Sequence, residues 1–193
     1  MRLLLTRHGE TKWNVLGKIN GTTDIALTVR GEEQAHRLGE RLLAEKIALV
    51  VSSPLIRAAR TAEIVSEIIG APLMFDERLR EIDVGQFEGA PVGTPEYLRA
   101  KGQLATKFPG GESVLMVAHR IYTLLDDIHQ TYRDKTILII CHGGICRVIN
   151  SYFNDMSNND FSHFKTGNCE IHEYRLTSDG QRNTINSGSF HAF

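Results

Sequence analysis

The stretch MRLLLTRHGET (residues 1–11) is typical of a buried parallel strand that ends in polar residues. Its three leucines lead within three residues to His8 and a glycine. The stretch TILIICHGG (residues 136–144) repeats the pattern, because its apolar run leads to His142 and a glycine. A third apolar run occupies residues 48–51, and a segment with helical periodicity follows each of the three runs. Strands that alternate with helices predict an α/β fold, here a three-layer sandwich with a mostly parallel central sheet flanked by helices.

Helix signals accompany these predicted strands. Ser53 and the proline after it predict the N-cap and first position of a helix that ends at Gly70. Ser113 is placed to cap a helix whose apolar stripe continues to Ile128. Another helix is expected over about residues 29–45. Two late strands are expected at residues 168–176 and 183–185, with a turn at residues 178–180 between them.

The composition is that of a globular protein. The 193 residues include 22 Lys and Arg against 23 Asp and Glu, and 41% are hydrophobic, which predicts a single domain over residues 1–193. The near-neutral charge argues against nucleic-acid binding. No apolar run approaches the roughly 18 residues of a membrane helix, so no membrane partner is expected, and the first residues are interpreted as a strand, not a signal peptide. Three cysteines without a CxxC pair predict a reduced, cytoplasmic protein. The composition leaves the oligomeric state open.

The stretch from residue 82 to residue 111 differs from the rest of the chain. It holds six of the 17 glycines and three of the five prolines, which predicts a long loop with at most one short helix, near residues 96–103. Long loops inside a domain usually bind ligands, so we expect a substrate-facing loop or lid. A tolerated surface insertion is the alternative.

The ends of the predicted strands are the expected ligand site, because α/β proteins bind ligands at the carboxyl edge of the sheet. A glycine after His8 and after His142 would let the backbone approach a ligand. One such histidine is more often structural, but two in the same context favour a function. Arg57 is expected one turn into a helix, where a cation opposes the helix dipole and anions bind. Arg57 in this place indicates a phosphate or carboxylate ligand; the alternative is a side chain that extends into solvent. Arg60, one turn further, is expected at the surface or in a salt bridge.

Arginines beside histidines are not typical of a metal site, because arginine does not ligate metals. The sequence also lacks an HExxH motif and paired Cys/His spacings. Guanidinium groups instead match phosphate oxygens, and a histidine beside them can attack phosphorus. We therefore expect no metal and no cofactor, and a small phosphorylated metabolite as the partner. A nucleoside triphosphate is not the expected substrate, since no P-loop is present.

A series of motifs runs from the first predicted strand to about residue 150. They are RHGETKWN (7–14), NG (20–21), DIALT (24–28), SSPLIRA (52–58), LREI (79–82), GQFEG (85–89), PGGES (109–113) and HGG (142–144). The series resembles that of the histidine phosphatase superfamily, also called the phosphoglycerate mutase-like family. The resemblance implies that fold and a metal-independent phosphomonoesterase that acts through a phosphohistidine. The nearest subgroups it suggests are broad-specificity and α-ribazole phosphatases.

The resemblance also implies roles for individual residues. His8 would be the nucleophile, and Glu81 would protonate the leaving group and later activate water. Arg7, Arg57 and His142 would hold the phosphate oxygens. Further phosphate or substrate contacts are implied for Asn14, Asn20, Gly21 and Gly143. Without the resemblance, the residues leave the acid open among Glu81, Asp76, Glu77 and Asp83.

Two positions depart from the family pattern and bear on substrate range. Asn20 stands where glutamine is usual, and Phe87 stands where tryptophan is frequent. A cofactor-dependent phosphoglycerate mutase remains an alternative, although Ile82-Asp-Val-Gly replaces the tyrosine- and glycine-bearing stretch that follows the acid in mutases. A non-catalytic phosphate-binding module is an alternative of another class, which the intact set of residues disfavours. Cys141 and Cys146 are expected to pack as small apolar residues.

Overall fold

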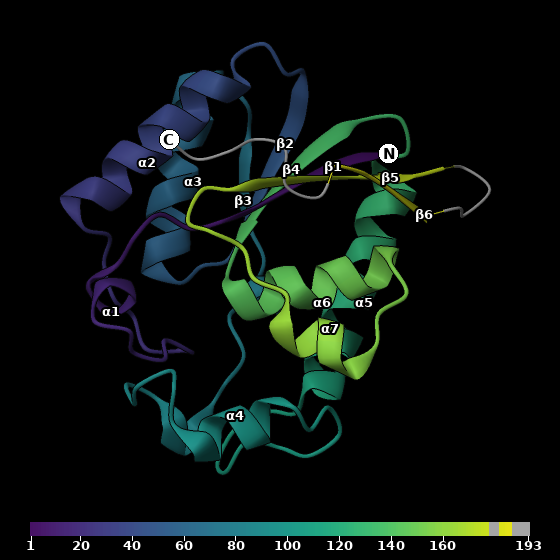
Figure 1. Cartoon of the computed structure of the whole chain (residues 1–193). Coiled ribbons are helices and arrows are strands. Elements are labelled where there is room, and N and C mark those ends of the chain that lie inside the picture. Colours follow the sequence, from purple (N-terminus) through teal and green to yellow (C-terminus); the bar gives the residue numbers. More distant parts are fainter. Residues whose placement is uncertain (178–181, 187–193) are drawn as a thin grey trace.

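A six-stranded sheet lies at the centre of the residues that the computed structural model describes, 1–177 and 182–186 (Figure 1). Its strands are β1 (Arg2–Arg7), β2 (Ile47–Ser52), β3 (Leu73–Phe75), β4 (Thr136–Cys141), β5 (Ile171–Leu176) and β6 (Arg182–Asn186). They lie in the order β3-β2-β4-β1-β5-β6. The pairs among β1 to β4 are parallel, while β5 and β6 are antiparallel to their neighbours. The predicted mostly parallel sheet and both late strands are confirmed, and the turn predicted at residues 178–180 lies outside the described residues.

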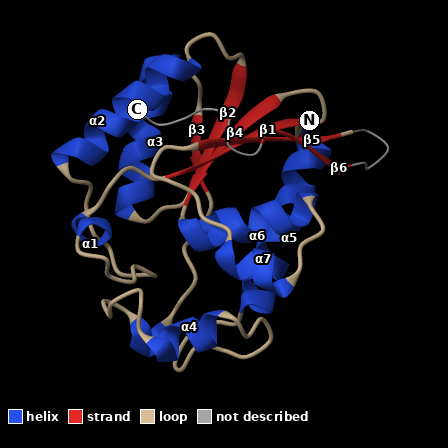
Figure 2. Ribbon diagram, in the orientation of Figure 1, coloured by secondary structure: helices blue, strands red, loops and turns tan. Residues whose placement is uncertain are grey.

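Helices cover both faces of the sheet (Figure 2). One face carries α2 (Val29–Leu42) and α3 (Ile56–Ile69), and the other carries α5 (Val114–Thr131) and α6 (Gly143–Phe153). The predicted three layers are therefore present. The remaining short helices are α1 (Lys12–Val15), α4 (Pro95–Lys101), α7 (Asn158–His163) and the 3₁₀ helices η1 (Glu77–Leu79) and η2 (Gly85–Phe87).

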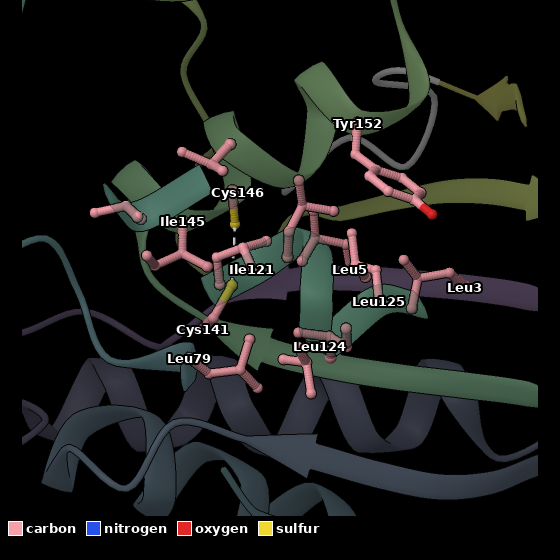
Figure 3. Close-up of a cluster of buried hydrophobic side chains, with 14 of the residues drawn as sticks. Leu3, Leu5, Leu79, Ile121, Leu124, Leu125, Cys141, Ile145, Cys146 and Tyr152 are labelled. Carbon is pink, nitrogen blue, oxygen red and sulfur yellow. Dashed lines mark hydrogen bonds between the residues drawn. The ribbon is translucent and has the colours of Figure 1, made fainter. Parts of the chain in front are cut away.

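Alternate residues of the central strands pack on opposite faces. Leu3 and Leu5 of β1 belong to the buried cluster under α5 and α6, whereas Leu4 belongs to the cluster under α2 and α3. Figure 3 shows the first cluster, in which side chains of the strands lie against Ile121 and Cys146 of the helices. Because both faces of the sheet are buried, the register of β1 against β4 is fixed. This register determines where the last residues of both strands lie.

The start of α3 differs from the prediction. The helix begins at Ile56 instead of at Pro54, and its N-cap Leu55 lacks a side-chain cap bond. The hydroxyl of Ser53 accepts the N–H of Leu55 at 3.2 Å and lies 2.8 Å from the Nε2 atom of His142. Ser53 was therefore wrongly predicted as the N-cap of α3: it bonds the backbone two residues ahead, but the helix begins only at Ile56, and the hydroxyl also contacts His142.

The other helix ends agree more closely with the sequence signals. Ser113 caps α5 by accepting the backbone N–H of Met116, and Gly70 ends α3 in the left-handed conformation, so both predictions are confirmed. The helix predicted over residues 29–45 is shorter and ends at Leu42.

The stretch 82–111 packs against the main core instead of projecting as a surface loop. It contains α4 as predicted, but also η2, so the expectation of at most one short helix was wrong. Phe87, Tyr97 and Phe108 form a ring cluster with centroids 5.6 to 6.0 Å apart. Phe108 is buried in the main core, which ties the stretch to the sheet.

No helix among the described residues is both long and apolar enough to span a membrane. The three cysteines are free and buried. Cys141 ends β4 and Cys146 lies in α6, with their sulfurs 3.6 Å apart inside the core (Figure 3). The prediction that both pack as small apolar residues is confirmed.

Candidate active site

The sheet brings the two histidine–glycine strand ends together. Arg7 is paired with Cys141 in the parallel ladder of β1 and β4, and the next residue, His8, donates its backbone N–H to the carbonyl of Cys141 at 3.0 Å. The imidazole rings of His8 and His142 consequently lie with their centroids 5.3 Å apart. This places both side chains at the carboxyl edge, where the sequence predicts the site.

His8 is buried at this edge as a neutral imidazole with one free nitrogen. Its Nδ1 atom lies 2.7 Å from the carbonyl oxygen of Gly9. A carbonyl only accepts, so the proton sits on Nδ1 and the Nε2 lone pair is free. Burial, together with the positive charges of Arg7 and Arg57, holds the pKa of His8 well below its usual range. The imidazole is therefore neutral and its Nε2 atom is unprotonated, as a nucleophile needs.

His142 is also neutral, but both of its ring nitrogens are engaged. The Nε–H of Arg57 donates to its Nδ1 at 3.2 Å, so the ring proton sits on Nε2 and points to the hydroxyl of Ser53 at 2.8 Å. Burial and the charge of Arg57 hold the pKa of His142 well below its usual range. These two contacts lock the orientation of the ring.

Arg57 is the largest fully buried side chain. Its two Nη atoms donate to the carbonyls of Thr23 (2.9 Å) and Gly21 (2.7 Å), and burial lowers its pKa to about 10. The carboxylate of Glu88, in the 82–111 stretch, accepts the backbone N–H groups of Gly21 and Thr22. A residue of the predicted lid thus supports the loop that holds Arg57.

Arg7 is held less completely. One Nη atom donates to the carbonyl of Thr166 at 3.1 Å, while its Nε atom is buried without a hydrogen-bond partner among the described residues. Burial lowers its pKa. A buried donor without a partner is costly, so this guanidinium is suited to an anionic ligand.

Glu81 is the acidic residue that reaches the site. Its Oε2 accepts the backbone N–H of Gly144 at 2.9 Å, and its Oε1 accepts that of Ile82 at 2.8 Å. A Cβ atom on Gly144 would lie 2.4 Å from Oε1, so a side chain at this position would displace the carboxylate of Glu81. The other acids that the residues alone left open face elsewhere: Asp76 pairs with Arg78, Glu77 with Arg80, and Asp83 accepts the N–H of Gly85.

These residues surround a cavity of about 630 Å³. Of the sequence-predicted site residues, it is lined by Arg7, His8, Asn14, Asn20, Glu81 and Gly143. Arg57, His142 and Gly21 are not among the lining residues but lie behind them: the ring of His142 lies beside that of His8, and Arg57 donates to His142 and to the carbonyl of Gly21. Both amide atoms of Asn20 are buried without a partner among the described residues, as expected of a side chain that awaits a ligand.

The glycine after His8 has a different role from the predicted one. A Cβ atom on Gly9 would lie 2.3 Å from the carbonyl oxygen of Gly31. It therefore permits close packing of the first strand end against α2, not the approach of a ligand.

Comparison with known proteins agrees with this arrangement. Residues 3–186 match the profile of the histidine phosphatase superfamily (branch 1). The chain belongs to this superfamily. A probable phosphoglycerate mutase, GpmB of Salmonella choleraesuis (strain SC-B67), is 36% identical over 150 residues, which are 74% of this chain and 70% of that protein.

Solved structures give the same fold. A mycobacterial glucosyl-3-phosphoglycerate phosphatase in complex with VO3 is 26% identical, with a TM-score of 0.86 over 96% of this chain and 98% of that one. A phosphoserine phosphatase from Entamoeba histolytica, in complex with 3-phosphoglyceric acid, is 28% identical, with a TM-score of 0.84 over 97% and 98% of the chains. Together, family and structures support a phosphoric monoester hydrolase, the enzyme class that the sequence predicts.

This histidine phosphatase also uses residues that the sequence did not single out. Asn168 donates its amide N–H to the carbonyl of His8 at 2.7 Å and lies 3.3 Å from the amide oxygen of Asn14. Arg120 of α5 donates to the carbonyls of Arg78 and Glu81 and so clamps the segment that carries the acid. Neither contact follows from a local pattern. Among the described residues, no three His, Cys, Asp or Glu side chains gather as a metal site would require.

Proposed function

We propose that this chain is a metal-independent phosphomonoesterase that hydrolyses a small phosphorylated metabolite through a phosphohistidine at His8. One observation carries the proposal: a neutral imidazole lines the cavity beside Arg7, with its Nδ1 proton donated to Gly9 and its Nε2 lone pair free. An imidazole held in this tautomer needs no further base to attack phosphorus.

In the first half-reaction, the Nε2 lone pair of His8 forms a bond to phosphorus as the ester P–O bond breaks. Arg7 supplies its unpartnered Nε–H for the phosphate oxygens, and Asn20 supplies an amide. Arg57 adds positive charge next to this lining, and neutral His142 fixes its orientation. Charge that spreads on the phosphoryl oxygens in the transition state is stabilised by these groups.

Glu81 supports both proton transfers. Its acid form gives a proton to the leaving oxygen, so the product departs as an alcohol. The resulting carboxylate then takes a proton from water, whose oxygen attacks phosphorus as the N–P bond breaks. This second step releases inorganic phosphate and restores neutral His8. The backbone N–H groups of Ile82 and Gly144 keep the carboxylate in place during both steps.

The test is phosphate release from p-nitrophenyl phosphate in the presence of EDTA. We expect turnover by the wild type, an acid-labile phosphoryl group on the protein after brief incubation, and loss of both in His8→Ala. His36→Ala is the matched control, since His36 is an exposed residue of α2. Full activity of His8→Ala, or wild-type activity that EDTA abolishes, would refute the proposal.

A phosphoglycerate mutase is the second candidate, because the relative at 36% identity is a probable enzyme of that kind. The site residues described above would serve either reaction. Following 3-phosphoglycerate by ³¹P NMR with 2,3-bisphosphoglycerate present distinguishes them. We expect inorganic phosphate to appear; accumulation of 2-phosphoglycerate without phosphate would favour the mutase.

The proposal also includes the domain organisation and the location of the protein. We expect one domain over residues 1–193 and a cytoplasmic location, which free, buried cysteines suit.

A further inference from the structure

The cavity holds more positive charge than a phosphate group needs. Beyond Arg7 it is lined by four cations: Lys18 of the segment after α1, Lys101 of α4, Arg147 of α6 and Lys165 of the segment after α7. The last three come from distant parts of the chain, yet the charges of Arg147 and Lys165 act on Lys101, so these three form one positively charged wall of the cavity. Glu81 is the one carboxylate among the lining residues that the structure describes.

Arg147 lacks the partner that a half-buried guanidinium usually has. Its Nε lies 3.5 Å from the carbonyl of Phe164, at the limit of a hydrogen bond, and its guanidinium lies 5.6 Å from the ring of Phe161. Within the described residues, no carboxylate forms an ion pair with it, although eight other arginines have one: Arg2, Arg30, Arg37, Arg60, Arg78, Arg80, Arg99 and Arg120. Its planar fork is therefore available to an oxyanion.

The neighbouring lysines make this wall still more positive. Burial lowers the pKa of Lys101 to about 8, with further lowering by the charges of Arg147 and Lys165. Like charges that repel one another inside a cavity are stabilised when an anion binds between them. Neither Lys101 nor Lys165 has an ion pair with a described carboxylate.

The place of these cations relative to the catalytic groups decides which part of a substrate they face. Gly144 donates to Glu81 at the start of α6, and Arg147 follows it by three residues, roughly one helical turn or about 5 Å. Burial lowers the pKa of Arg147, and the carboxylate of Glu81 lies close enough to oppose this lowering. The wall thus lies beyond Glu81, on the side of the leaving group.

We propose that Arg147, with Lys101 and Lys165, forms a second anion site that binds a carboxylate or phosphate on the leaving group of the substrate. This rests on the proposed phosphatase function and narrows it to phosphate esters that carry a second oxyanion. Two similar proteins are associated with such compounds: the E. histolytica phosphatase is in complex with 3-phosphoglyceric acid, and the mycobacterial enzyme is a glucosyl-3-phosphoglycerate phosphatase. Arg147 acts on substrate choice, while His8 and Glu81 act on the reaction.

The experiment compares matched esters by phosphate release. 3-Phosphoglycerate and glycerol 3-phosphate differ only by a carboxylate, and fructose 1,6-bisphosphate and fructose 6-phosphate differ only by a phosphate. We expect the wild type to favour the anionic member of at least one pair by about 10- to 100-fold in kcat/KM, the effect of one hydrogen-bonded charge. The pair that shows the preference identifies the oxyanion.

Variants then assign the preference to the site. Arg147→Gln should bring the ratio within that pair close to one, Arg147→Lys should restore part of it, and Lys101→Gln should lower it less. Arg99→Gln is the control. Arg99 lies in α4, as Lys101 does, but it pairs with Glu96 on the surface. If Arg147→Gln fails to fold, Lys101→Gln and Lys165→Gln decide by the same ratio.

The outcomes separate the two proposals. Wild-type ratios near one in both pairs, or a ratio that Arg147→Gln leaves unchanged, would overturn the second anion site. Turnover of p-nitrophenyl phosphate would still stand in that case, and with it the proposed function. A wild type that releases no phosphate from any ester would refute both.

Discussion

The ends of β1 and β4 carry the same histidine–glycine pattern, yet they differ in what surrounds the imidazole. At the first end, His8 lines the cavity with its Nε2 lone pair free. At the second end, His142 lies behind the lining, between Arg57 and Ser53, with both ring nitrogens in use. Identical local patterns in parallel strands therefore produce one histidine with a free ring nitrogen and one with both nitrogens engaged.

The difference shows how a single sheet edge can separate two tasks. The first end presents the nucleophile of the proposed reaction. The second end organises its surroundings, since His142 orients Arg57 and the nearby Gly144 holds the carboxylate of Glu81. Neighbours from α3 and from the end of β2, not the local motif, decide which histidine keeps a free ring nitrogen.

Exchanging either histidine for alanine tests this separation most strongly. We expect His8→Ala to lose about 10⁴-fold or more in kcat, because no covalent intermediate can form. We expect His142→Ala to lose about 10²- to 10³-fold, because Arg57 loses the contact that orients its charge toward the transferred phosphoryl group, and still to form a phosphoenzyme. The measurement is kcat with p-nitrophenyl phosphate together with rapid-quench trapping of the phosphoryl group. Equal losses, or a phosphoenzyme in His8→Ala, would break the comparison.

Glu81→Gln tests the proton transfers that the second strand end supports. An alkyl phosphate needs a proton on its leaving oxygen, so we expect a loss of about 10²- to 10⁴-fold with glycerol 3-phosphate. The nitrophenolate leaves without a proton, so phosphorylation of His8 by the nitrophenyl ester should slow much less. Attack of water still lacks a base, and pre-steady-state kinetics should show a burst.

Asp83→Asn is the matched control for this change. Its carboxylate accepts the N–H of Gly85 instead of lining the cavity. Equal losses on both esters in Glu81→Gln, without a burst, would argue against Glu81 as the acid and would move the role to Asp83.

Arg57→Lys tests the guanidinium that His142 orients. Lysine keeps the charge, but it does not reach His142, Gly21 and Thr23 at the same time. We expect kcat/KM to fall about 10²-fold, with loss in both binding and transfer. Arg60→Lys, on the exposed next turn with Glu32 as its partner, should leave the kinetics unchanged. A functional Arg57→Lys protein would mean that charge alone suffices behind the lining.

The smallest of the expected effects is on the pH profile, which tests whether His8 is neutral at the first strand end. Burial and two arginines hold the pKa of His8 well below 6.5, so its neutral form persists as the pH falls from 7 to 6. The burst rate with the nitrophenyl ester should therefore change little over this interval. A histidine with an ordinary pKa of about 6.5 would lose about threefold in its neutral fraction. A threefold loss would contradict a desolvated nucleophile.

Much of the fold could be predicted because the signals are local. Runs of strand length, an apolar stripe after Ser113 and the stop at Gly70 depend on residues within a few positions of one another. The strands and helix ends predicted from these signals agree closely with the structure. The cap predicted at Ser53 was wrong, since α3 begins only at Ile56, and local signals also gave no sign that the Ser53 hydroxyl contacts His142, 89 residues away.

The residues of the candidate site were predicted in part by pattern and in part by resemblance. Strand-end histidines followed from the pattern, and Glu81 was selected among nearby acids only by the family motif. Arg147 was not predicted, since a lone arginine inside a helix carries no signal that it will face a cavity. Its lack of a carboxylate partner is visible only when α4, α6 and the segment after α7 are in place.

The succession of strands and helices along the chain, and the two histidines at strand ends, are properties of the sequence itself, because backbone propensity and hydrophobic period act over a few residues. The tautomer of His8, the burial of Arg57 and the gathering of unpaired cations around Arg147 are properties of the folded molecule. Desolvation and charge depend on distances in space, and folding sets these distances between residues as remote as Arg7 and Thr166, which are 159 positions apart.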